Sequence, residues 1–159
     1  MTAIFLLLLA GLLVLFAFNR DAFWEQIAGP ADLGPYDFTQ GKRRSVPNDA
    51  LACTPGVCNS QPEVALAVFD ESPEALMRRV TAIVMAGPES ALRADDASNP
   101  AHARFVIRTR LLRYPDTLDV EAAPLADGRS GLRLYSRSKL GRNDYGANKA
   151  RLEAIAGRL

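Results

Sequence analysis

Histidine and tryptophan each occur once in this chain of 159 residues, cysteine occurs twice and methionine three times. One histidine, His102, and two thiols are too few to complete the four-ligand set of a structural zinc site. No internal repeat occurs, and the length leaves room for one domain beside an N-terminal segment, but not for two separate cores. We therefore expect a single domain with no metal and no cofactor.

Charge and proline are both absent from residues 3–18, which read AIFLLLLAGLLVLFAF. As a helix this stretch rises about 24 Å, close to the ~30 Å hydrocarbon core of a bilayer. A cleaved signal peptide is the alternative, but the basic start and the small-x-small cleavage site that it needs are missing. Phe23 and Trp24 suit the headgroup level. We predict an uncleaved signal-anchor over residues 1–24 that crosses the membrane through residues 3–18.

The two cysteines bear on the side of the membrane that the domain occupies. Cys53 and Cys58 frame the loop CTPGVC, whose Pro-Gly centre favours a tight turn that brings the sulfur atoms together. A disulfide persists only in an oxidising compartment, and two free buried thiols are the alternative. Arg20 and the basic run 42–44 follow the apolar segment and favour a cytoplasmic domain instead. On balance we expect a single-pass membrane protein with an extracytoplasmic domain.

The net charge of +1 hides an uneven distribution. Residues 1–92 contain six Lys or Arg against ten Asp or Glu, and residues 93–159 contain thirteen against eight. Such a basic half favours phosphates, including lipid headgroups. Aromatic residues do not alternate with the arginines as single-strand stacking requires, so no nucleic-acid partner is expected. A solvated surface of mixed charge is the simpler explanation.

Residues 25–62 are rich in Gly, Pro, Asn and Asp and show neither strand nor helix periodicity. This composition predicts an irregular tether and opening segment that packs partly against the domain. A short apolar strand is expected next, at 63–69. Ser72 then suits the N-cap and Pro73 the first turn of a helix that ends before Gly87.

The domain proper is expected over residues 63–159. Apolar and polar residues alternate in three segments, at 103–114, 117–122 and 131–139, with a weaker edge strand at 90–95. The period of 2 predicts an antiparallel sheet of about four to five strands, with one apolar face and the other face in water. The predicted fold class is α+β, with two main helices packed on one face of the sheet.

Arginines dominate the polar side of these strands. Arg108, Arg110 and Arg133 are candidates to pair across strands with Asp119 and Glu121, each pair contributing a few tenths of a kcal/mol. An anion-binding face against phospholipid is the alternative.

A polar cluster marks the entry into the last predicted helix, which runs from Asn143-Asp144 to Gly157. Asp144, Asn148 and Arg151 are spaced i, i+4, i+7 and share one helix face, and Arg137 on the preceding strand can reach the same place. A helix N-terminus flanked by arginines predicts a site for a phosphate or carboxylate. The structural alternative is that Asn143 or Asp144 caps the helix and Asp144 pairs with Arg137 or Arg151. The apolar side chains expected to face inward are Leu152, Ile155 and Tyr145.

The segment SRSKLGRNDYGANKARLE, residues 136–153, resembles the C-terminal signature of the family called domain of unknown function 1499. Upstream, PNDALACTPGVCNS and RTRLLRYPDTLDV are similar to its opening two-cysteine segment and its central aromatic-Pro-Asp turn. The resemblance covers about residues 30–157. It implies a bacterial or plastid protein, often with an N-terminal membrane segment, and it implies no established activity. With a bacterial source, the expected location is the inner membrane, with a single pass and the domain in the periplasm. The residues on motif positions are Arg137, Gly141, Asp144, Gly146, Asn148 and Arg151.

Three functions are compatible with these features. The first is a non-enzymatic, membrane-anchored accessory domain that binds a partner protein or an anionic ligand, such as a lipid. The second is a hydrolase or transferase for a phosphate-bearing envelope substrate, with Asp144 as base and Arg137 and Arg151 as anion clamps. The third is a purely structural envelope component. Because no histidine, cysteine or second carboxylate accompanies Asp144, we assign no catalytic residue and favour the first.

Overall fold

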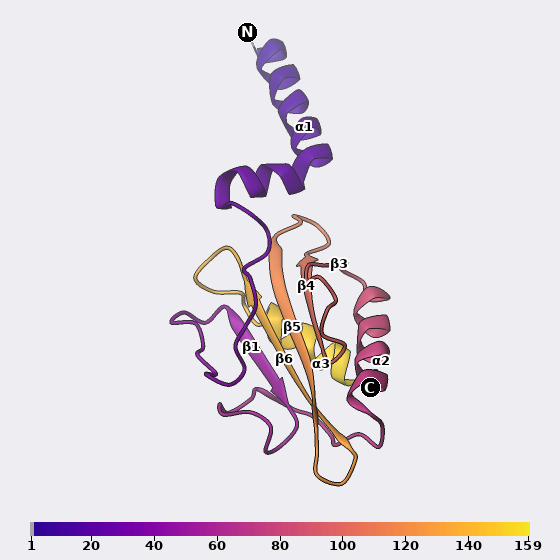
Figure 1. Ribbon diagram of the computed structural model, residues 1–159. Coiled ribbons are helices and arrows are strands. Elements are labelled where there is room, and N and C mark those ends of the chain that lie inside the picture. Colours follow the sequence, from indigo (N-terminus) through magenta and orange to yellow (C-terminus); the bar gives the residue numbers. More distant parts are fainter. Residues whose placement is uncertain (1) are drawn as a thin grey trace.

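The computed structural model describes residues 2–159 as an α+β domain from which one apolar helix extends (Figure 1). The helices are α1 (Thr2–Ala28), α2 (Pro73–Met85) and α3 (Ala147–Ala156). The strands are β1 (Asp49–Cys53), β2 (Val64–Ala65), β3 (Ser90–Arg93), β4 (His102–Arg108), β5 (Pro115–Pro124) and β6 (Ser130–Ser138).

The sheet has six strands in the order β2-β1-β6-β5-β4-β3, and it is mixed. We expected about four to five antiparallel strands, so the α+β class is confirmed and the strand count and direction are corrected. The difference comes from β1, which lies in the stretch expected to be irregular and pairs antiparallel with β6 but parallel with β2. At only five residues, DALAC is too short to show a period in a stretch rich in turn residues.

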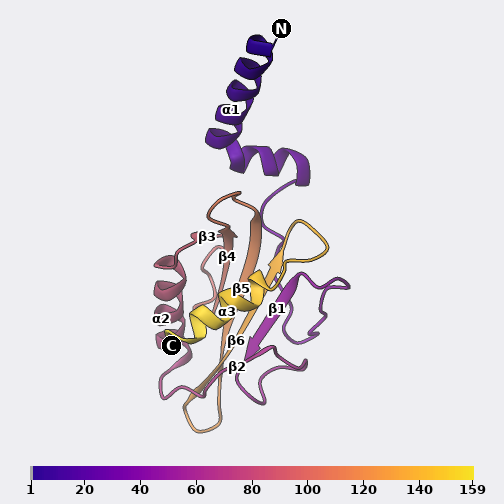
Figure 2. The same cartoon turned by 180° about the vertical axis from the view of Figure 1, so that it is seen from behind.

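Both domain helices cover the same face of the sheet, as the view from behind shows (Figure 2). Ser72 caps α2 by accepting a hydrogen bond from the backbone N–H of Ala75, and Pro73 opens the helix, as predicted. The core lies between these helices and the sheet, and its fully buried side chains include Leu76, Val80, Phe105, Leu118, Leu134 and Leu152.

The opposite face of the sheet is buried too, which corrects the expectation that it faces water. Irregular chain before β1 packs over it, so that Tyr36 and Phe38 are buried against Leu51 and Tyr135. The rings of Tyr36 and Tyr135 stack with centroids 3.8 Å apart. The alternating pattern identified which residues share a face, but it could not reveal that a segment without periodicity covers the second one.

Three other elements differ from the sequence-based expectation. The strand expected at 63–69 is reduced to β2, Val64–Ala65, with an isolated bridge from Phe69 to Ser130. The strand expected over 103–114 ends at Arg108, and the apolar residues after it form a loop in which Leu111 is 77% exposed. Helix α3 begins at Ala147 because Tyr145 and Gly146 both have positive φ, which no α-helix continues. Tyr145 was expected to face inward and is instead 94% exposed, whereas Leu152 and Ile155 are buried as predicted.

Helix α1 is long and apolar enough, over Ile4–Ala28, to cross a membrane by length and composition, a property shared by anchors and signal sequences. It bends at Asn19, whose φ of −121° and ψ of 24° are not helical. After the bend the helix runs across the end of the domain (Figure 1).

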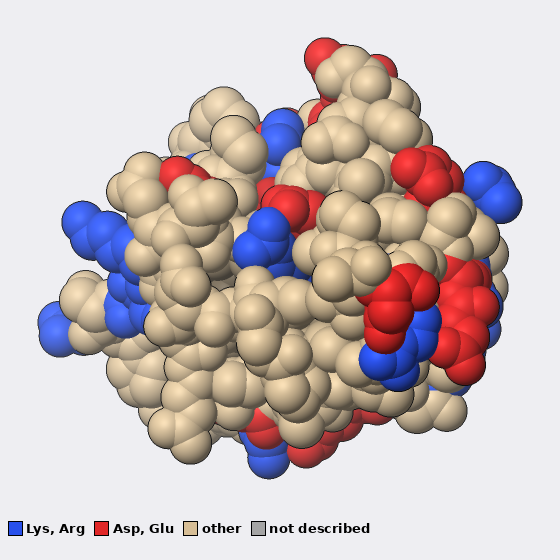
Figure 3. Space-filling model, turned by 60° about the horizontal axis from the view of Figure 1, so that its bottom comes forward, with Lys and Arg blue, Asp and Glu red and all other residues tan. Residues whose placement is uncertain are grey.

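The uneven charge of the two halves of the sequence is largely resolved by ion pairs in the fold. Acids from the N-terminal half meet arginines from the C-terminal half, as in Asp32–Arg104, Asp21–Arg113 and Glu89–Arg151. Of the cross-strand pairs predicted, Arg133–Glu121 forms, whereas Arg108 turns to α1. On the side shown in Figure 3, both signs of charge are dispersed over a mostly uncharged surface.

Candidate functional site

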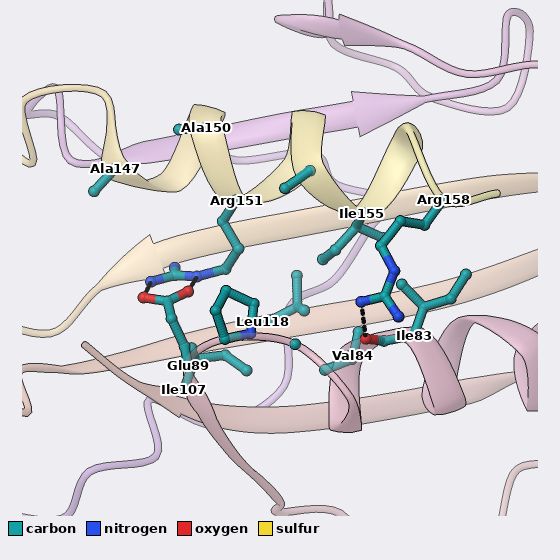
Figure 4. A pocket seen from close by; sticks show the side chains of 13 residues that line it. Ile83, Val84, Glu89, Ile107, Leu118, Ala147, Ala150, Arg151, Ile155 and Arg158 are labelled. Carbon is teal, nitrogen blue, oxygen red and sulfur yellow. Dashed lines mark hydrogen bonds and ion pairs between the residues drawn. The ribbon is translucent and has the colours of Figure 1, made fainter. Parts of the chain in front are cut away.

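Arg151 is a buried polar side chain under α3, with 8% of its surface exposed. Its Nε and Nη2 donate to the two carboxylate oxygens of Glu89 at 2.6 and 2.9 Å, and Nη2 also donates to Asp116 at 2.7 Å. Glu89 lies in the loop after α2, as its pair with Arg151 in Figure 4 shows. Asp116 lies on β5, so one guanidinium joins three elements.

Asn148 completes this cluster one turn earlier on α3. Its side-chain oxygen accepts hydrogen bonds from Ser136 at 2.6 Å and from Arg151 at 2.9 Å. Its amide nitrogen donates to Asp144 at 2.7 Å and to Ser138 at 2.9 Å. Asp144 also accepts from the backbone N–H of Asn148 at 2.9 Å and so supports the first turn of α3. The structural alternative is otherwise corrected: the N-cap residue is Gly146 rather than Asn143 or Asp144, and Arg137 and Arg151 pair with Asp119, Glu89 and Asp116 instead of Asp144.

The electrostatics of the cluster follow from two carboxylates facing one guanidinium. Burial raises the pKa of Asp116 above its usual range, opposed by the charge of Arg151 and reinforced by the nearby Glu89. Burial works against the charged form of Arg151, but its hydrogen bonds and charge pairing with Glu89 and Asp116 outweigh that effect and raise its pKa. Arg151 is therefore always charged, and its N–H groups are committed to protein partners.

Arg137, the fourth residue of the predicted anion site, lies on the other face of the sheet. It donates to Asp119 at 3.2 Å and to the backbone oxygen of Gly34, and its guanidinium packs on the rings of Tyr36 and Tyr135. The structure thus brings Asp144, Asn148 and Arg151 together and separates Arg137 from them by the thickness of the sheet. A clamp made of Arg137 and Arg151 is not assembled.

Beside the Arg151 cluster, an apolar groove of about 310 Å³ opens between α2 and α3. Two arginines cross it: Arg151 of α3 reaches Glu89 at one end, and Arg158, just after the end of α3, donates to the backbone oxygen of Ile83 at 3.1 Å at the other (Figure 4). Apolar side chains form the floor and walls between these two crossings, namely Ile83, Val84, Pro88, Ile107, Leu118 and Ile155.

The groove and two of the partners of Arg151 were not found from the sequence. Asp116 was assigned to a hairpin turn and Glu89 to the chain after a helix stop, and nothing in their spacing connects either to Arg151. The excess of acids in residues 1–92 and of arginines in residues 93–159 was the one available signal. Among residues 2–159, no group of three or more His, Cys, Asp or Glu side chains is placed to hold a metal ion.

Cys53 and Cys58 are joined as a disulfide, with their Cα atoms 6.3 Å apart. Cys53 ends β1, and Cys58 follows the turn that contains Gly56, whose φ is 85°. The pair predicted from the CTPGVC loop is therefore placed together, which indicates an oxidising compartment.

Fold and site together define an α+β domain with an N-terminal apolar helix, a disulfide-closed loop and a groove beside a buried arginine cluster. The family described as "Protein of unknown function (DUF1499)" matches residues 39–159, so the chain belongs to that family, as its resemblance indicated. Comparisons with curated proteins and with solved structures gave no match.

Proposed function

We propose that this protein is a single-pass membrane protein whose domain, on the periplasmic side of a bacterial inner membrane, binds an anionic single-chain amphiphile in the groove between α2 and α3. It acts as a binding domain, and no catalytic step is assigned to it.

The apolar groove is the observation that carries this proposal. At about 310 Å³ it falls at the lower end of the ~300–1,000 Å³ range of small-molecule sites, and its walls are mainly aliphatic, as is usual for such sites. It has about twice the volume of the ~150 Å³ apolar cavity that accepts benzene, so a hydrocarbon segment of roughly ten carbons fits. Exposed apolar surface of this kind is covered when a ligand is bound.

The charges at the two ends of the groove select the ligand's head. Arg151 is neutralised by Glu89 and Asp116, so that end does not attract an anion. Arg158 is exposed and has only a neutral backbone oxygen as its described partner, so a carboxylate or phosphate at that end gains a charge-assisted hydrogen bond. An apolar chain with an anionic head therefore complements the groove along its length.

The membrane and the disulfide supply the setting. An apolar N-terminal helix keeps the domain beside a reservoir of amphiphiles, and the disulfide between Cys53 and Cys58 favours the oxidising side of the membrane.

The test uses the full chain in phosphatidylcholine vesicles that contain a photoactivatable fatty acid. After illumination, we expect crosslinks in α1, which touches the bilayer, and separately in the α2 and α3 segments that line the groove. Ala154→Phe places a large ring in the groove and is expected to abolish the α2 and α3 crosslinks while those in α1 persist.

Glu153→Phe is the matched control, because Glu153 is the exposed neighbour on α3 and does not line the groove. This variant should keep the full crosslinking pattern. A second arm with photoactivatable phosphatidylglycerol shows whether the chain arrives on a phospholipid or as a free acid. Crosslinks confined to α1 in the unaltered protein, with both probes, would refute the proposal.

A further inference from the structure

Helix α1 is fixed to the domain rather than joined to it by a flexible tether. Arg113 donates two hydrogen bonds to Asp21, at 2.5 and 2.6 Å, and Arg108 pairs with Glu25 at 2.5 Å. The indole N–H of Trp24 donates to the backbone oxygen of Leu112 at 2.7 Å. These contacts hold the part of α1 after the bend against the β4–β5 loop, residues 109–114.

The backbone of that loop is strained where it makes the contact. Arg113 has a φ of 58°, which is costly for a residue with a side chain, and its bidentate pair with Asp21 offsets part of the cost. Trp24 and Tyr114 also pack together, with ring centroids 4.7 Å apart. The loop is thus held at the level where α1 turns.

The same end of the domain exposes a cluster of large apolar side chains. They come from α1, from the β4–β5 loop and from the β6–α3 loop, residues 139–146, and Trp24, Tyr114 and Tyr145 line one hollow of about 450 Å³. The exposed members are Phe18, Phe23, Ile27, Leu111, Leu112, Tyr114 and Tyr145. We define these residues as the membrane-proximal face.

The charges around this face suit an anionic bilayer. Arg110 and Arg142 are exposed in its two loops, whereas Asp21 and Glu25 are paired with Arg108 and Arg113. Aromatic and leucine side chains beside arginines are the composition that lies at the membrane–water interface. The face is also continuous with the apolar part of α1. With that part of α1 in a bilayer, the surface of the same bilayer covers the face.

We propose that the membrane-proximal face lies in the headgroup layer, so that the domain is docked on the bilayer in one orientation with Leu111 and Tyr145 inserted. This inference rests on α1 crossing the membrane, as proposed above, but not on the groove or its ligand. In this arrangement residues 20–28 run along the surface, and the bend at Asn19 is the point where the chain leaves the hydrocarbon core.

The test measures fluorescence of the full chain in vesicles of phosphatidylglycerol and brominated phosphatidylcholine, because bromine quenches indoles that reach the bilayer. Leu111→Trp and Tyr145→Trp each add one indole on the membrane-proximal face. Val68→Trp is the matched control, since Val68 is partly exposed and precedes Phe69, which pairs with Ser130 at the opposite end of the sheet.

We expect most of the added fluorescence to be lost in the first two variants and to be retained in Val68→Trp, while Trp24 contributes equally to all three. Equal fluorescence in all three variants would overturn the docked orientation. Carbonate extraction of the same vesicles reports separately on the anchor: retention of the chain with no quenching at Leu111→Trp overturns docking alone, and release of the chain overturns both.

Discussion

Arg151 joins three elements of the fold through one buried guanidinium. It is buried under α3 and binds Glu89, Asp116, Ser136 and Asn148, so it sets the distance of α3 from the sheet and from the end of α2. Removing one member of a buried ion pair costs about 3–5 kcal/mol, because the remaining charge stays buried without compensation. Here two carboxylates depend on one guanidinium.

We predict that Arg151→Ala lowers the free energy of unfolding by about 3–5 kcal/mol, measured by denaturant titration of the full chain in detergent. Arg158→Ala, at an exposed residue just after the end of α3 whose described partner is a backbone oxygen, should change it by less than about 1 kcal/mol. If both variants lose the same small amount, Arg151 is not the structural centre of the cluster.

Asp49 is an acid with several hydrogen-bond donors around it, on the face of the sheet opposite to Arg151. It accepts hydrogen bonds from Nε and Nη2 of Arg43 at 3.0 Å each and from the hydroxyl of Tyr135. Burial opposes ionisation of Asp49, but these hydrogen bonds outweigh it, so its pKa is lower than the ordinary 3.8.

Because the pKa of Asp49 is lower in the folded state, its stabilising effect is present above pH 3.8 and is lost as pH falls through the folded-state pKa. We predict that Asp49→Asn is less stable than the parent at neutral pH and loses less stability on acidification below about pH 4. For Asp116, the pKa is raised in the folded state, so its contribution to stability is largest at low pH and falls as pH rises through the folded-state pKa. Parallel acid limbs for Asp49→Asn and the parent would contradict this account.

Helix α2 and the faces of strands β4, β5 and β6 were predictable from local patterns. Ser72-Pro73 and Gly87-Pro88 limit α2, and alternation assigned Phe105, Leu118 and Leu134 to the core correctly. Strand β1 and the start of α3 were not predictable in this way. The first depends on a partner strand about 85 residues away, and the second depends on positive φ at Tyr145, a residue that rarely adopts it.

The polar cluster was predicted in part, and its error has a physical explanation. Asp144, Asn148 and Arg151 do lie together as the spacing predicted, but only Asn148 and Arg151 are on α3, and Asp144 precedes the helix. Arg137 was included because it is close in sequence to the other three residues. A strand period of 2 already places Arg137 and Ser136 on opposite faces of the sheet, and Ser136 faces α3 together with Leu134. The groove depends on how far two helices lie apart, which no local pattern encodes.

Considered as a whole, the molecule combines an apolar N-terminal helix that is fixed to the domain with two neighbouring hollows. The larger, of about 450 Å³, lies at the membrane-proximal end, and the apolar groove of about 310 Å³ lies beside α3. Ala147, the first residue of α3, borders both. With the domain docked as proposed, an amphiphile that leaves the bilayer would have a short route into the groove, past the Arg151 cluster.

The proposed binding function is tested most directly by nuclear Overhauser effects between a bound amphiphile and the groove's methyl groups. The full chain, labelled at the methyl groups of isoleucine and valine, is placed in bicelles with a protonated fatty acid among deuterated lipids. Our account predicts contacts from the fatty acid's chain to Ile83, Val84 and Ile155. Contacts limited to methyl groups of α1, such as Ile4 and Val14, would contradict it.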